Sequence, residues 1–176
     1  MGFTRNAVRV TLWLPLLVGC FLLATGSPAS AEDDKLGGHF GIVLPLVTRS
    51  DGVTTTIGDD FKIGFPMGVT VKKTDKVAID FELVPVIHNS PRLVSLTVHP
   101  GVIYSVAPSI AVGLRMAFDV REGSWGFTPL IGKSFPVNGG ACALFAELDV
   151  PIRFQEDAAG RSVTAVTVAA HFGVGF

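Results

Sequence analysis

Charge and cysteine are scarce in this sequence of 176 residues. Charged residues make up 16% of the chain, against about 25% in an average soluble domain, while hydrophobic residues make up 48%. The two cysteines, Cys20 and Cys142, are too few for a cysteine-based metal site, and no basic cluster points to nucleic acid. A composition so poor in charge suits a protein whose surface faces something other than water.

Long apolar runs are also missing, except at the N-terminus, where one predicts a cleavable signal peptide over residues 1–31. Arg5 and Arg9 precede the apolar stretch at residues 10–24, and Ala29, Ser30 and Ala31 provide a small-residue cleavage site. A transmembrane anchor is the alternative, but the stretch is too short and lacks a stop-transfer flank.

A lipoprotein-type cleavage box ends at Cys20, yet the apolar run continues beyond it, which argues against lipidation. We therefore expect an exported domain of residues 32–176. Cys142 is the single cysteine of that domain, so no disulfide can form within it.

Apolar residues alternate with small or polar residues along this domain, and a helical period is missing. This period of two predicts an all-β protein of eight antiparallel strands. The strands are expected at residues 38–48, 61–72, 77–88, 93–106, 110–120, 127–137, 141–155 and 163–176. Short turns at 73–76, 107–109 and 138–140 alternate with connections at 49–60, 89–92, 121–126 and 156–162. Short turns on one rim and longer loops on the other are typical of an up-and-down transmembrane β-barrel with both termini in the periplasm.

The last predicted strand carries the most specific pattern. One of its faces holds Thr164, Val166, Val168, Ala170, Phe172, Val174 and Phe176. A strand of this kind that ends in Phe resembles the assembly signal of bacterial outer-membrane β-barrel proteins. Together with the export segment and the strand count, it makes the chain similar to small eight-stranded barrels of the OmpA/OmpX type. The resemblance implies contact with outer-membrane lipid and recognition of Phe172, Val174 and Phe176 by the barrel-assembly machinery.

Two features depart from that pattern. Tyr104 and Trp125 are the only Tyr and Trp of the exported domain, so the aromatic girdles are thin. Lys133 falls on the outward face of its strand by simple alternation, and a bulge near Gly132 would be needed to turn it inward.

Most of the remaining charge falls on the inward face of the predicted strands. The expected polar network of the lumen is Lys62, Asp80, Glu82, His99, Arg115, Glu147, Asp149, Arg153 and His171. Pairing neighbouring strands by the shortest hairpins sets Glu82 beside His99 and also sets Glu147 beside His171. An eight-stranded barrel is just wide enough for its own side chains, and buried charges must be paired. These residues therefore predict a packed polar lumen rather than a path through the barrel.

Prolines inside the predicted strands are unusual, because proline donates no ladder hydrogen bond. In the register that we expect, four of them lie opposite one another across the first four strands: Pro45, Pro66, Pro85 and Pro100. Bulges that curve the sheet are the simpler interpretation. The alternative is a weakened seam that opens sideways and releases an apolar molecule into the bilayer.

The sequence predicts no catalytic site, no metal and no cofactor. His88, Asn89 and Ser90 have the H-x-S spacing that resembles the catalytic pair of outer-membrane lipid A deacylases. A nucleophile also needs a group that orients its base, and the next strand offers no suitable acidic residue. His39 and His171 are expected to meet where the first and last strands close the barrel, but two histidines do not make a metal site.

Three functions remain open. The first is a non-catalytic outer-membrane protein with a packed lumen and a structural or surface role. The second is a passive carrier of small apolar solutes with lateral release. The third is a soluble periplasmic lipocalin-like barrel, which would hide apolar residues inside and show charge outside. Because charge clusters on the face that carries most glycines, the membrane orientation is favoured.

Overall fold

The computed structural model describes residues 35–121, 123–137, 142–157 and 159–176. The predicted signal peptide over residues 1–31 and the predicted turn at 138–140 lie outside the described residues. Across the described ranges, no helix is long and apolar enough to cross a membrane.

The secondary structure of the described ranges consists of β-strands. They are β1 (Lys35–Ser50), β2 (Val53–Thr56), β3 (Lys62–Gly64), β4 (Met67–Lys72), β5 (Val77–His88), β6 (Leu93–Ala107), β7 (Ile110–Asp119), β8 (Trp125–Val137), β9 (Cys142–Asp149), β10 (Ile152–Glu156) and β11 (Ser162–Gly175). β5 has the bounds that the sequence predicts, and the ends of most others differ by one to three residues.

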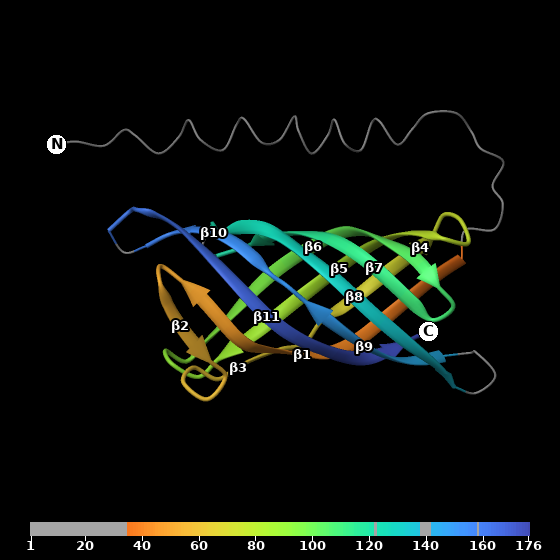
Figure 1. The fold of residues 1–176 in the computed structure, drawn as a ribbon, viewed down its shortest axis with the longest axis horizontal. Helices are drawn as coiled ribbons and strands as arrows, with labels where there is room; N and C mark the ends of the chain where they lie inside the picture. Colours follow the sequence, from red (N-terminus) through yellow and green to blue (C-terminus); the bar gives the residue numbers. More distant parts are fainter. Residues whose placement is uncertain (1–34, 122, 138–141, 158) are drawn as a thin grey trace, which may run out of the picture. The chain divides into compact units, whose positions relative to one another are not determined.

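These strands form one antiparallel sheet that closes on itself (Figure 1). β1 pairs with β11 along most of its length, from His39 opposite Gly175 to Ser50 opposite Ala165. β3 and β4 share one position in the wall, since both pair with β1 and β5, and β9 and β10 share another between β8 and β11. The ring therefore has eight strand positions, which confirms the predicted up-and-down antiparallel β-barrel.

Proline explains why two of the predicted strands are each divided in two. Pro66 lies between β3 and β4, and Pro151 lies between β9 and β10. A proline has no N–H to donate to the neighbouring strand, so the ladder is interrupted there. The backbone is still tied across both gaps, because Phe65 N–H donates to the Pro85 carbonyl at 2.9 Å and Thr167 N–H donates to the Pro151 carbonyl at 2.8 Å.

The expectation that four prolines lie opposite one another is wrong. The prolines concerned are Pro45, Pro66, Pro85 and Pro100. In the structure Pro85 lies opposite Leu96 and Pro100 lies opposite Phe81, because the connection at 89–92 fixes the register of this hairpin. On the side of the second strand, Val43 lies opposite Gly64 and the Gly41 N–H donates to the Pro66 carbonyl, so Pro45 does not face Pro66. The carbonyls of Pro66 and Pro85 both accept backbone hydrogen bonds, so the prolines do not form a common seam.

The outer wall of the barrel is apolar. Large hydrophobic side chains are exposed on it, among them Phe40 (53%), Leu114 (51%) and Phe172 (51%). Tyr104 is 44% exposed and lies opposite Val77 at the short-turn end of the barrel. Trp125 is 43% exposed at the opposite end, so an amphipathic ring marks each end of the apolar wall.

Lys133 lies on the outer wall, as simple alternation predicts, and no bulge near Gly132 turns it inward. The register of β8 runs without a shift past both neighbours, with Lys133 opposite Ala146 of β9 and Ile110 of β7. Ile110 is the first residue of β7, so Lys133 lies near the short-turn rim, where a long side chain can reach the membrane surface. Its ammonium lies 5.5 Å from the centre of the Phe135 ring.

One segment that was expected to be a loop, residues 49–60, contains a further strand. β1 continues to Ser50, and β2 pairs back on it after a turn formed by Asp51 and Gly52, which both have positive φ. An Asp-Gly pair with this backbone is typical of a tight hairpin. The Arg161 guanidinium from the connection between β10 and β11 lies 3.8 Å from the Asp51 carboxylate, so these two long hairpins meet at one rim.

Candidate functional site

Nine polar side chains cross the lumen, and we call them the charged layer. They are His39, Asp80, Glu82, His99, Arg115, Glu147, Asp149, Arg153 and His171. Strand alternation turns them all inward. The layer contains eight of the nine residues expected in the lumen network. The exception is Lys62, whose ammonium pairs with Asp60 at 2.8 Å while its side chain is 34% exposed.

Arg115 lies at the centre of this layer and is 3% exposed. Its Nε donates to Asp80 on β5 at 2.7 Å, and one terminal nitrogen donates to Glu147 on β9 at 3.1 Å. The same nitrogen lies 3.9 Å from Glu82. A guanidinium group has five N–H donors in a fixed plane, which lets one side chain connect carboxylates from strands on both sides of the lumen.

Glu82 is held between two histidines. Its two carboxylate oxygens lie 3.0 Å from His39 Nε2 and 3.1 Å from His99 Nδ1. Glu82 and His99 are direct partners in the ladder of β5 and β6, the register that the shortest hairpin gives. His99 Nε2 lies 3.3 Å from the Arg153 guanidinium, which also donates to Thr128 at 3.1 Å. These contacts thus connect side chains from β1, β5, β6, β8 and β10.

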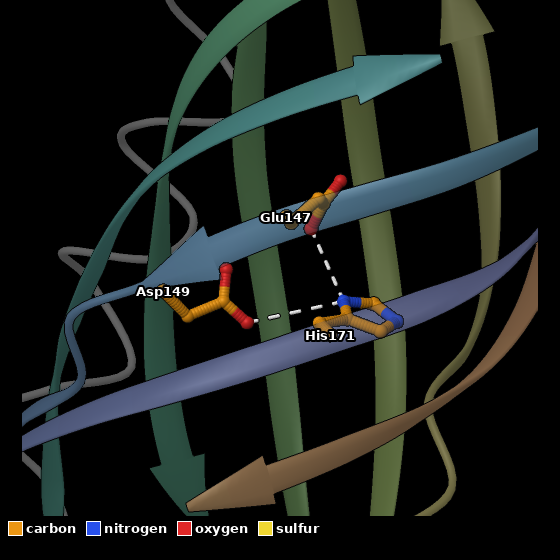
Figure 2. A group of neighbouring side chains, drawn as sticks. All are labelled: Glu147, Asp149 and His171. Carbon is orange, nitrogen blue, oxygen red and sulfur yellow. Dashed lines mark hydrogen bonds and ion pairs between the residues drawn. The ribbon is translucent and has the colours of Figure 1, made fainter. Parts of the chain in front are cut away.

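Glu147, Asp149 and His171 form a group of their own within the layer (Figure 2). Glu147 and Asp149 are two residues apart on β9, and His171 is the direct partner of Glu147 on β11. His171 Nδ1 lies 3.1 Å from a Glu147 oxygen and 3.8 Å from an Asp149 oxygen. The other Asp149 oxygen, Oδ1, and His171 Nε2 are buried without a hydrogen-bond partner.

Beyond the layer, on the side of the short turns, the lumen is filled by larger side chains. The Phe145 ring packs edge-on against His171, with 4.9 Å between ring centres, and lies 6.0 Å from His39. Ile103 and Leu130 fill the space over Gly113, where a Cβ atom would come within 2.5 Å of Ile103 and 3.1 Å of Leu130.

On the side of the longer loops, the lumen contains a cavity of about 410 Å³. Charged-layer residues, including His99, Arg115 and Asp149, form its floor. Six threonines also line it: Thr48, Thr55, Thr56, Thr97, Thr128 and Thr167. The lumen is therefore packed on one side of the charged layer and hollow on the other, which corrects the expectation that it is packed throughout.

The H-x-S motif does not bring a base to Ser90. The His88 imidazole lies 2.9 Å from the Ser95 hydroxyl, across the hairpin of β5 and β6. Ser90 is exposed in the connection between these strands. The expected assembly residues Phe172, Val174 and Phe176 are exposed on the outer wall, and their role remains a prediction.

Sequence reasoning missed two parts of this site. His39 was expected inside but was not assigned to the network, although it lies 3.0 Å from Glu82. The grouping of Glu147, Asp149 and His171 was also missed as a possible set of metal ligands. The signal was present, because two acidic residues at i and i+2 share a strand face and the expected register already set Glu147 beside His171.

Comparison with known proteins gives likeness of fold only. No family model and no curated protein matches the chain. OprG, an outer membrane protein from Pseudomonas aeruginosa, is 9% identical with a TM-score of 0.44, over 81% of this chain and 94% of its own. Ail, the attachment invasion locus protein of Yersinia pestis, is 9% identical with a TM-score of 0.43, over 80% of this chain and 97% of its own. A de novo designed transmembrane β-barrel is 15% identical with a TM-score of 0.42, over 81% of this chain and 98% of its own.

Proposed function

We propose that this protein is a non-catalytic outer-membrane β-barrel with a closed lumen and a structural or surface role in the envelope. The observation that carries this proposal is the position of Arg115, which joins Asp80 and Glu147 from strands across the lumen. Charges held this closely are costly to separate, because each would be left buried and uncompensated. The layer therefore acts as a permanent seal rather than as a gate.

The outer wall supports the membrane location. Apolar side chains such as Phe40 and Phe172 are about half exposed, and a closed barrel leaves few backbone groups unpaired in hydrocarbon. The export-type segment at residues 1–31 directs such a chain out of the cytoplasm. Membrane lipid is then the principal partner, with the short turns and both termini in the periplasm.

The two other functions receive less support. A carrier for apolar solutes needs an apolar path through the barrel. The wall of the cavity includes apolar residues such as Val43, Val84 and Val86 beside the threonines, but the cavity ends on charged side chains. The staggered prolines also remove the reason to expect lateral opening. A soluble lipocalin-like barrel would expose its charge to water, whereas here Asp80 and Glu82 are 1% and 2% exposed.

The proposal is tested by location and conductance together. The full-length chain is expressed in a Gram-negative host, and unheated and boiled outer-membrane samples are compared on a denaturing gel. We expect an outer-membrane band that changes mobility on boiling, and a purified barrel that adds no conductance to a planar lipid bilayer. A porin from the same host is the positive control for insertion. Stepwise conductance from this barrel would contradict the sealed lumen, and a soluble periplasmic band would contradict the membrane location.

A further inference from the structure

The spacing of Glu147, Asp149 and His171 suits a metal ion. One ligand atom from each lies within 4.8 Å of the others. In a tetrahedral zinc site with bonds of roughly 2.0–2.2 Å, neighbouring ligand atoms are about 3.3–3.6 Å apart. The distances from His171 Nδ1 to Glu147 and Asp149, 3.1 and 3.8 Å, lie on either side of that value. Small side-chain movements would bring all three donors to bonding distance.

A second observation comes from Asp149 itself. The residue is 5% exposed, and its Oδ1 atom is buried without a hydrogen-bond partner. In Figure 2 one carboxylate oxygen of Asp149 is directed toward His171, and the other, on the same side chain, has no drawn interaction. A buried carboxylate oxygen without a donor is costly, and a cation bound between these side chains would satisfy it.

The balance of charges in the whole charged layer also favours a bound cation. The layer contains four carboxylates and two guanidinium groups, so the carboxylates outnumber the guanidinium groups by two. A divalent cation would add two positive charges at this place. Arg115, which lies 3.1 Å from Glu147, compensates only part of the negative charge beside the group because it also binds Asp80.

The group is also reachable. Asp149 and His171 line the cavity that extends toward the longer loops, whereas Glu147 does not. An ion would therefore enter from the cavity side of the group, where there is room for water as a fourth ligand. One imidazole and two carboxylates suit first-row transition metals, whereas calcium and magnesium take mainly oxygen ligands. We propose that Glu147, Asp149 and His171 bind a divalent transition-metal ion of the zinc class next to the floor of the cavity.

This inference goes beyond the proposed structural role and departs from the expectation of no metal. The test uses the refolded barrel in detergent, stripped with a chelator and then titrated with Zn²⁺ or Co²⁺. We expect one equivalent of Zn²⁺ per barrel and a visible d–d absorption band with Co²⁺. Asp149→Asn and His171→Gln should each weaken Zn²⁺ binding by at least the roughly 10–100-fold that loss of an outer-shell partner costs.

His88→Gln is the matched control, because it removes a histidine at the rim, bonded to Ser95, and leaves the three ligands intact. Zn²⁺ affinity is measured only for variants whose heat-modifiable band shows that they have folded. Unchanged Zn²⁺ affinity in folded Asp149→Asn and His171→Gln barrels would overturn the proposal. If neither variant folds, the wild-type Co²⁺ spectrum decides: a band that saturates at one equivalent supports the site, and no band overturns it. This test does not measure conductance. A negative result would therefore overturn the metal site without affecting the proposal of a sealed lumen.

Discussion

The two sides of the charged layer differ in how the barrel fills its interior. Toward the short turns, Phe145, Ile103 and Leu130 pack against glycines of neighbouring strands. Toward the longer loops, six threonines, apolar residues such as Val84 and Val86, and the floor of charged groups surround a cavity of about 410 Å³. The same ring of eight strands forms both sides, so the difference arises from side chains and not from the number of strands.

This contrast shows how a small barrel can be closed and yet retain space. Large residues next to glycines fill the narrow lumen without water, whereas threonine hydroxyls can bond to one another or to water. Thr48 and Thr167 illustrate this, with 2.9 Å between their hydroxyl oxygens. The seal therefore depends on the charged layer and on the packed side, while the hollow side can change with little consequence for closure.

The largest effect is expected from Arg115→Met, which removes the cation at the centre of the layer. Asp80 and Glu147 would then remain buried without their partner, and we expect a loss of about 3–5 kcal/mol in the free energy of unfolding. The measurement is a urea titration of the refolded barrel in lipid vesicles. Arg161→Met is the control, because its side chain is 70% exposed and an exposed ion pair contributes at most about 1 kcal/mol. Equal losses in both variants would show that the layer is not a buried network.

A smaller loss is expected from Gly173→Ala on the packed side. The added Cβ atom would lie 2.6 Å from the Phe145 ring and would also meet the Phe40 carbonyl, so the core must shift. Overpacking of this kind costs about 1–3 kcal/mol. Gly175→Ala on the same strand is the control, because the nearest atom to its Cβ is 3.8 Å away. If the two variants unfold at the same urea concentration, the packed side is looser than the structure indicates.

The fold could be predicted because its determinants are local. Alternation over β5 and β6 and the turn residues between them are sufficient to find both strands, and the shortest hairpin sets Glu82 opposite His99. The expectation for Pro85 and Pro100 assumed a different register for the same pair and failed. Strand alternation also decides which charges point inward, so most of the charged layer follows from the sequence once the outer wall is recognised as the apolar one. Neither step needs information about the opposite side of the barrel.

The features that were missed depend on how distant strands meet. Lys62 would join the charged layer only if its position along the barrel axis matched that of the other charged residues. The ion pair with Asp60 holds it nearer the rim. The cavity depends on the volumes of side chains from all eight strand positions, which no single hairpin determines. The division of strands at Pro66 and Pro151 could have been anticipated from the missing N–H, but the bonds across the gaps required the observed register.

The smallest effect is expected on the hollow side, from Thr167→Val. Valine keeps the shape of threonine but removes the hydroxyl that lies 2.9 Å from Thr48, and water from the cavity can replace it. We therefore expect a loss of about 0.5–1.5 kcal/mol, measured by the same urea titration. Thr164→Val is the control, because Thr164 is exposed on the outer wall of the same strand and valine suits lipid there. A loss as large as that of Arg115→Met would mean that the cavity wall is a dry part of the seal, and the contrast between the two sides of the lumen would have to be abandoned.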